Sequence, residues 1–111
     1  MVRDVKIADT EETVLVATGI MNKHEIGCIV VTNKEKPVGI VTERDLLKRV
    51  LSARKDPGKI RLNGIMSKPL VCVDPHMTIG KAAQVMIKQR IKKLIVMKNE
   101  HLLGILSLTD V

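Results

Sequence analysis

The sequence contains no phenylalanine, tyrosine or tryptophan among its 111 residues. A hydrophobic core must therefore be built from aliphatic residues and methionine, within a hydrophobic content of 45%. The same absence removes the aromatic platforms on which proteins usually stack the bases of single-stranded nucleic acids. Any purine bound by this chain would lie against aliphatic side chains.

Signals for disulfides and metal sites are also sparse. The two cysteines, Cys28 and Cys72, are 44 positions apart in apolar segments and form no C-x-x-C pair. This pattern favours buried, unreactive thiols over a disulfide or a metal ligand. The three histidines are scattered along the chain, which argues against a zinc site. We expect no required cofactor.

Long apolar runs and catalytic motifs are missing as well. No run approaches the about 20 residues of a membrane helix, and no signal peptide is recognisable, so a cytoplasmic location is the expectation. Gly80-Lys81 does not complete a P-loop, because Pro75 and Ala82 occupy the first glycine and Ser/Thr positions. Without a nucleophile elbow or paired catalytic carboxylates, we do not expect an enzyme.

Basic residues outnumber acidic ones, with 19 lysines and arginines against 12 acids and a formal net charge of +7. This excess predicts an anionic partner. A nucleic-acid-associated protein is one alternative, although the lack of aromatic residues makes it the second choice.

The main organising feature is an internal repeat. Residues 1–45 align without a gap with residues 66–110, which lie 65 positions further along the chain. The identical pairs include Asp9 and Asp74, Thr13 and Thr78, Ala17 and Ala82, Met21 and Met86, and Gly39 and Gly104. This pattern predicts a tandem duplication of one supersecondary unit.

Each copy closes with the same short motif, Gly39-Ile40-Val41-Thr42-Glu43-Arg44-Asp45 and Gly104-Ile105-Leu106-Ser107-Leu108-Thr109-Asp110. A strand leads into a helix whose start carries a hydroxyl and, three residues later, a carboxylate. That spacing is a helix-capping pattern. It also suits a phosphorylated sugar, because the helix N-terminus favours phosphate and the carboxylate accepts ribose hydroxyls. Both interpretations remain open.

The remaining pattern predicts helices and hairpins in the same order in both copies. In the first copy we expect a helix at 14–24 ended by Gly27, strands at 28–32 and 38–41, and a helix from Glu43 to about Ala53. In the second copy we expect a strand at 70–73, a helix capped by Thr78, and strands at 93–97 and 102–106. The last helix should be missing or truncated, because the chain stops at Val111.

The side chains of these elements carry further expectations. Leu46, Leu47, Val50 and Leu51 should point inward from the helix of the first motif. On the same helix Arg44, Lys48 and Arg49 are expected on a solvated face. Met21, Met66 and Met86 are expected to fill gaps in the core.

The duplicated motifs, together with Ile26-Gly27-Cys28-Ile29-Val30-Val31 and Ile65-Met66-Ser67-Lys68-Pro69, resemble the CBS-domain family, named after cystathionine β-synthase. The resemblance implies an α/β fold: a tandem CBS-domain pair, or Bateman module, of two β-α-β-β-α units related by a pseudo-twofold axis. We assign residues 1–53 to the first CBS motif, 54–65 to a connector and 66–111 to the second.

The resemblance also implies regulatory binding of an adenosine-containing ligand, AMP, ADP, ATP or S-adenosylmethionine, in clefts between the units. Asp45 and Asp110 would accept ribose hydroxyls, and Thr42 and Ser107 would contact ribose or phosphate. Ile40 and Ile105, with Val5 and Leu70, would wall the adenine. Cys28, Lys92 and Lys93 would lie at the mouths of the clefts, where the lysines could meet phosphate.

Because Lys92 and Lys93 stand where the first copy has Gly27 and Cys28, we expect unequal sites. The Asp110 site should prefer the more phosphorylated ligand. The resemblance further implies a disc-like homodimer through the helices that follow the motifs, and a regulated partner protein. A dimerisation module with vestigial pockets is a further alternative.

Overall fold

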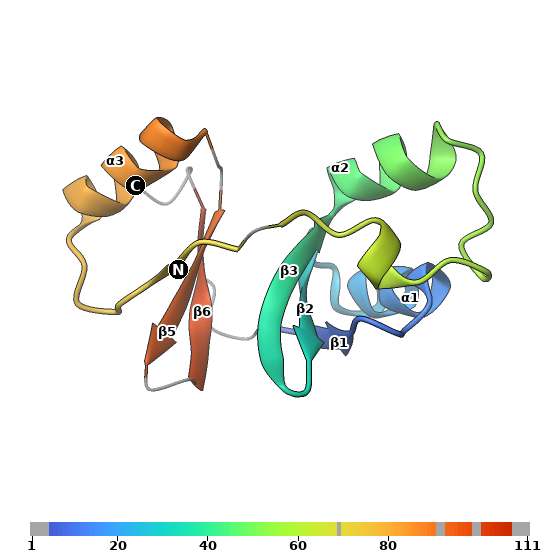
Figure 1. Ribbon diagram of the computed structural model, residues 1–111, viewed down its shortest axis with the longest axis horizontal. Coiled ribbons are helices and arrows are strands. Elements are labelled where there is room, and N and C mark those ends of the chain that lie inside the picture. The colour runs from blue at the N-terminus through green and yellow to red at the C-terminus, as the bar shows by residue number, and fades with distance from the viewer. Residues whose placement is uncertain (1–4, 69, 91–92, 99–100, 108–111) are drawn as a thin grey trace. The chain divides into compact units, whose positions relative to one another are not determined.

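The computed structural model describes residues 5–68, 70–90, 93–98 and 101–107 (Figure 1). These residues divide into two compact units. The first unit consists of residues 6–68, and the second consists of Val5 with residues 70–107. The connector expected at 54–65 therefore belongs structurally to the first unit.

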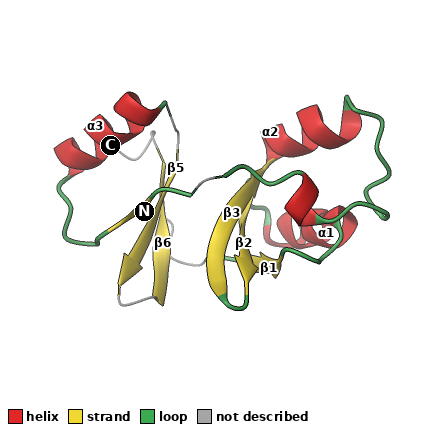
Figure 2. Cartoon of the chain, in the orientation of Figure 1, coloured by secondary structure: helices red, strands yellow, loops and turns green. Residues whose placement is uncertain are grey.

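The first unit is a three-stranded sheet with helices packed on one face (Figure 2). Strand β1 (Ile7–Asp9) runs parallel to β2 (Cys28–Asn33), which pairs antiparallel with β3 (Lys36–Thr42). The helical elements are α1 (Val14–His24), α2 (Glu43–Leu46), the π-helical segment η1 (Leu47–Leu51) and the 3-10 turn η2 (Leu62–Gly64). The expected helix at 14–24 is confirmed to the residue.

The second unit repeats this plan in the residues described. Strand β4 (Cys72–Val73) is parallel to β5 (Lys93–Lys98), which pairs antiparallel with β6 (His101–Ser107), and α3 (Ile79–Gln89) precedes β5. Even the register irregularity is shared, since it falls after Val31 in the first hairpin and after Val96 in the second. The structure thus confirms the α/β fold and the duplication.

Both long helices begin at a capping threonine and end on a residue other than glycine. The Thr13 hydroxyl accepts from Val16 N, and the Thr78 hydroxyl accepts from Lys81 N. The helices end at Glu25 and Arg90, which hold left-handed φ angles of 53° and 55°. Gly27 therefore does not end α1, because Glu25 N donates to the Asn22 carbonyl and closes the helix two residues earlier.

The core of the first unit gathers on the α1 face of its sheet. Ile29 and Val31 from β2 and Val41 from β3 pack with Val14 and Ala17 of α1. The connector also contributes, with Leu62 and Ile65 fully buried and Ile60 packed against the cluster. The sequence pattern did not predict this contribution.

The helix after the first motif differs from expectation in its form and its buried face. Only Glu43–Leu46 is α-helical; Leu47–Leu51 is π-helical, with Ser52 N donating to Leu47 O. Val50 is buried and Leu46 packs on the core, whereas Leu47 and Leu51 are exposed. The inward orientation expected for Leu47 and Leu51 is therefore wrong, because one narrow stripe of this helix meets the core.

The sulfur-containing residues follow the expectations in part. Met21, Met66 and Met86 are buried, as expected of core-filling residues. Cys28 and Cys72 are not joined by a disulfide, and Cys28 is only half-buried while Cys72 is exposed. Burial of both thiols was thus a wrong expectation, since in the two-residue strand β4 Val73 faces the core and Cys72 faces outward. No helix among the described residues is long and apolar enough to cross a membrane.

Candidate functional site

The candidate residues of the first unit meet at one end of the β2-β3 hairpin. Cys28 pairs with Thr42, and Val30 pairs with Ile40. Paired residues and residues two apart share a face of the sheet. These four side chains therefore form one patch on the face opposite to α1, and Ile40 and Val30 are buried there.

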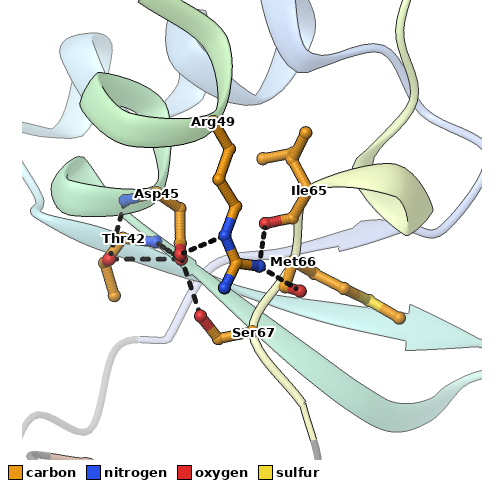
Figure 3. Close-up of polar contacts among 6 residues, drawn as sticks. All are labelled: Thr42, Asp45, Arg49, Ile65, Met66 and Ser67. Atoms are coloured by element: carbon orange, nitrogen blue, oxygen red, sulfur yellow. Dashed lines mark hydrogen bonds and ion pairs between the residues drawn. The ribbon is translucent and has the colours of Figure 1, made fainter. Parts of the chain in front are cut away.

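A turn of helix starts at the end of this patch and carries the motif carboxylate (Figure 3). Asp45 is only 6% exposed. Its Oδ2 accepts from Thr42 N at 2.9 Å and from the Thr42 hydroxyl at 3.2 Å, and that hydroxyl in turn accepts from Asp45 N. The capping interpretation of Thr42 and Asp45 is confirmed, since this is a reciprocal capping box.

The other carboxylate oxygen reaches a distant part of the chain. Asp45 Oδ1 accepts from the Ser67 hydroxyl at 2.8 Å, and the Ser67 backbone forms a two-bond bridge to Ile40. The segment that carries Ser67 thus lies beside β3 and closes one side of the patch. Ser67 is the residue that sequence reasoning missed, although it stands in the quoted Ile65-Met66-Ser67 motif.

Arg49 ties the same segment to the helix. Its Nη1 donates to the carbonyls of Ile65 and Met66 at 3.1 Å each, and its Nε lies 3.8 Å from Asp45 Oδ1. Figure 3 shows the guanidinium between the carboxylate and the two carbonyls. The Arg49 side chain is half-exposed, as expected of a solvated face, and it also holds the backbone after η2 through these two hydrogen bonds. Arg44 and Lys48 are exposed, as expected.

Gly39 explains how the Met66 segment approaches β3 so closely. A Cβ placed on Gly39 would lie 2.5 Å from Met66 Sδ and 3.2 Å from Met66 Cβ. A side chain at this position would therefore force the Met66 side chain to move away from the strand. Gly39, the opening residue of the motif, thus lets the segment that leads to Ser67 pack closely against β3.

The second unit places its candidates in the same register. Lys93 pairs with Ser107 and Ile95 with Ile105, as Cys28 pairs with Thr42 and Val30 with Ile40. Lys93 is half-buried and Ile105 is buried. Lys92, Asp110 and the Ser107 side chain lie outside the described residues. The repeat pairs Ser67 with Val2, so no hydroxyl occupies its counterpart position.

The two strand-opening candidates, Val5 and Leu70, both belong to the second unit. Each is half-buried and precedes a residue that extends the sheet, since Val30 N donates to Lys6 O and Ile95 N donates to Val71 O. Val5 is thus assigned to a different unit from Cys28, Ile40, Thr42 and Asp45. No group of three or more metal-ligating side chains gathers among the described residues.

The arrangement offers a ligand three kinds of contact in the first unit. The patch supplies an apolar wall, Asp45 supplies a carboxylate acceptor, and the N-terminus of α2 supplies a partial positive charge. A carboxylate has about four lone-pair positions, of which Thr42 and Ser67 take three here. This chemistry suits a neutral, hydroxyl-rich ring with an apolar base.

Comparison with known proteins gives a consistent result. The family model described as "CBS domain" matches residues 1–52 and again residues 62–111. An uncharacterized protein of Methanopyrus kandleri is 37% identical, with 98% of this chain covering 57% of that protein. An inosine-5'-monophosphate dehydrogenase of Methanocaldococcus jannaschii is 31% identical, but the match spans only 22% of that protein.

Among solved structures, the hexameric CBS-CP12 protein from bloom-forming cyanobacteria has a TM-score of 0.91 and 31% identity. That match covers 99% of this chain and 62% of the cyanobacterial one. This chain therefore spans only about a fifth to three fifths of these three proteins. The double match to the family model, the duplicated fold and the shared register lead to one conclusion: the chain belongs to the CBS-domain family, as a tandem pair of CBS motifs.

Proposed function

We propose that this chain is a regulatory module that binds an adenosine-containing ligand, with AMP, ADP, ATP and S-adenosylmethionine as the candidates. The observation that carries the proposal is the position of Asp45. A buried carboxylate at a helix N-terminus adjoins an apolar patch of Cys28, Val30, Ile40 and Thr42. An adenine base fits the patch, and ribose hydroxyls fit the carboxylate.

In this proposal a ribose hydroxyl either takes the fourth lone-pair position of Asp45 or displaces the Ser67 hydroxyl. Displacement would release one of the contacts that hold the segment after η2 to the helix, leaving Arg49 to hold the carbonyls of Ile65 and Met66. Ligand binding would thereby shift the population of conformations presented to a partner protein. The named relatives support a regulatory setting, since one is an inosine-5'-monophosphate dehydrogenase matched over 22% of its length and one is named a CBS-CP12 protein.

The test is isothermal titration calorimetry of the four candidate ligands against the wild-type chain, Asp45→Ala and Asp110→Ala. Each variant should lose one of two binding events, and the site lost with Asp110→Ala should be the one that prefers ATP, because of Lys92 and Lys93. Glu43→Ala is the matched control, since Glu43 is an exposed acid in the same helical turn. Unchanged binding in Asp45→Ala would rule out the assigned role of that residue.

Two outcomes would redirect the proposal. Binding of DNA or RNA that weakens steeply with salt and ignores Asp45→Ala would favour the nucleic-acid alternative. Failure of every adenosine compound to raise the melting temperature would favour a dimerisation module with vestigial pockets.

We also propose a homodimer formed through the helix that follows the first motif. Leu47 and Leu51, four residues apart on η1, expose a pair of large apolar side chains. Analytical ultracentrifugation should find a dimer that Leu47→Glu and Leu51→Glu together convert to a monomer. Leu15→Glu on α1, which alters an equally exposed leucine, should leave the dimer intact.

A further inference from the structure

Arg49 places a positive charge beside the candidate ribose acceptor of the first unit. Its Nε lies 3.8 Å from Asp45 Oδ1, and its Nη1 donates to the carbonyls of Ile65 and Met66 at 3.1 Å each. Because the guanidinium group is planar, these two hydrogen bonds also fix the direction of its remaining N–H groups. Arg49 is thus a positioned cation and not a freely moving surface charge.

The other terminal nitrogen of Arg49 is available to a ligand. Within the residues that the structure describes, no acceptor takes a hydrogen bond from Nη2, and the side chain is 50% exposed. Figure 3 shows this nitrogen without a dashed line, on the side of the guanidinium toward Ser67. The contacts with Ile65 and Met66 use Nη1 alone, so they leave both N–H groups of Nη2 for an anionic acceptor.

The Asp45 carboxylate can accept one more hydrogen bond while Ser67 stays in place, since Thr42 and Ser67 take three of its about four lone-pair positions. A ribose with free 2′ and 3′ hydroxyls brings a pair of donors, and one of them finds no acceptor on this carboxylate. A ribose that carries a phosphate on one of these oxygens brings one donor and a group of strong acceptors. The second pattern matches the open position on Asp45 and the free N–H groups of Arg49.

The charges around the carboxylate also favour an anionic group on the ribose. In the described part of the chain, Asp45 is the one acidic side chain paired with Arg49. Residues 43–49 carry three basic and two acidic side chains, and the exposed Lys68 directly follows Ser67. The net charge of these residues is positive, so a phosphate brought to Arg49 meets an attractive field.

We propose that the first-unit site selects an adenosine nucleotide that carries a phosphate ester on its ribose, at the 2′ or the 3′ oxygen. This inference rests on the proposed function, because Asp45 must first hold the ribose. The remaining ribose hydroxyl donates to Asp45, and the phosphate accepts from Arg49 Nη2. Arg49 is then a specificity-determining residue. Dinucleotide-binding domains divide the work in the same way, with an acid for a free ribose hydroxyl and an arginine for a ribose phosphate.

The experiment compares three isomeric ligands in calorimetric titrations: adenosine 2′,5′-bisphosphate, adenosine 3′,5′-bisphosphate and ADP. They differ only in the position of the second phosphate. The full chain with Asp110→Ala is used, so that the remaining binding event reports the first unit. One of the bisphosphates should bind at least about tenfold more tightly than ADP, because charge-assisted hydrogen bonds to phosphate replace an unmatched hydroxyl. The tighter isomer identifies the oxygen that carries the phosphate.

Arg49→Met, added to this chain, should abolish the preference for the bisphosphate, because it removes the Nη2 donors. Lys48→Met is the matched control, since it removes a positive charge from the adjacent exposed position and should keep the preference. Arg49→Met also loses the hydrogen bonds to Ile65 and Met66. A purely structural effect of that loss would weaken ADP and the bisphosphate equally, so the ratio of the two affinities separates the two roles.

The outcomes distinguish this inference from the proposed function. Equal or tighter binding of ADP than of both bisphosphates would overturn the inference and leave nucleotide binding established. A bisphosphate preference that survives Arg49→Met, or that Lys48→Met reduces equally, would also overturn it, because the phosphate would then be held elsewhere or by net charge alone. Absence of binding by AMP and all three isomers would overturn the proposed function itself.

Discussion

At the scale of single residues, Asp45 has two roles that need not conflict. Its carboxylate caps α2 through Thr42 and holds the segment after η2 through Ser67. Every buried polar side-chain atom in the described residues has a hydrogen-bond partner, and this includes the carboxylate oxygens of Asp45. Substitutions at the site therefore change stability as well as binding, and the two effects must be measured separately.

We expect Asp45→Ala to lower the free energy of unfolding by about 1–3 kcal/mol, because Thr42 N and the Ser67 hydroxyl lose their acceptor in a buried setting. Ser67→Ala should lower it by about 1 kcal/mol or less, since the carboxylate keeps Thr42 and Arg49. Urea denaturation of the two variants and of Glu43→Ala, which should be nearly neutral, measures the difference. Equal losses from Asp45→Ala and Ser67→Ala would show that the cap contributes nothing.

These residues also mark the limit of prediction from the sequence at this scale. Thr42 and Asp45 are three residues apart, and a capping box is a local arrangement that their spacing alone predicts. Ser67 and Arg49 act through partners 22 and 16 residues away. Their roles depend on where η2 places the chain, and no local pattern encodes that position.

The helix ends give a second prediction. Glu25 and Arg90 hold left-handed backbone angles that glycine adopts without the steric strain of a Cβ. Glu25→Gly should raise the free energy of unfolding by about 0.5–1 kcal/mol, the net of relieved strain and the greater freedom of glycine in the unfolded chain. The measurement is thermal or urea unfolding. Asn22→Gly, inside the exposed face of α1, is the control and should destabilise by about 1 kcal/mol.

Cys72 gives a prediction about pH. Partial burial raises the pKa of its thiol above the ordinary value. The folded chain therefore keeps the Cys72 proton at pH values where the unfolded chain has begun to lose it. The contribution of this thiol to the free energy of unfolding is complete below the unfolded pKa and declines as pH rises through the folded pKa. Alkylation of Cys72 by iodoacetamide should reach half its maximal rate at a higher pH in the folded chain than in urea. Coincident pH profiles would contradict the shift.

At the scale of elements, the repeat made most of the fold predictable. Helix α1 and the two hairpins follow from apolar periodicity, capping threonines and turn residues that recur 65 positions later. The connector escaped prediction because Ile60, Leu62 and Ile65 fit neither a helical nor a regular strand period. Their burial results from docking against α1, which is a tertiary effect.

The predicted buried face of the helix after the first motif was wrong for a related reason. A helical period of 3.6 residues groups Leu46, Leu47, Val50 and Leu51 on one broad face. In the structure only Leu46 and Val50 of these four contact the core. The π-helical turn at Leu47–Leu51 changes which residues of the helix face the core. Two apolar residues are left exposed, which is the basis for the proposed dimer contact.

The connector yields an element-scale prediction. Leu62→Ala should lower the free energy of unfolding by about 2–5 kcal/mol, because Leu62 is fully buried in the first-unit core. Urea denaturation followed by circular dichroism provides the measurement. Leu15→Ala, at a leucine that is 57% exposed on α1, is the matched control and should change stability by about 0.5 kcal/mol or less. Similar small effects from both variants would show that the connector does not stabilise the unit.

At the scale of the whole molecule, duplication has been followed by divergence of the two units. The two hairpins have the same register and a bulge at the same place. Each unit also has a helix capped by a threonine. The first unit has a core reinforced by η1 and the connector, whereas the described core of the second unit consists of sheet residues and α3, with Met77 packed against it. The sequence also differs at the start of the second hairpin, where Lys92 and Lys93 stand in place of Gly27 and Cys28.

This divergence predicts unequal local stability. Because β2 and β5 have the same pairing and register, a difference in their hydrogen exchange reports the packing above them and not the strand geometry. Amides of β5 should exchange faster than those of β2, because in the described residues the core against β2 includes Leu62 and Ile65 of the connector, which have no equivalent in the described core against β5. Hydrogen-exchange mass spectrometry resolves the two strands in one experiment. Equal protection of the two strands would show that the connector adds no stability to its unit.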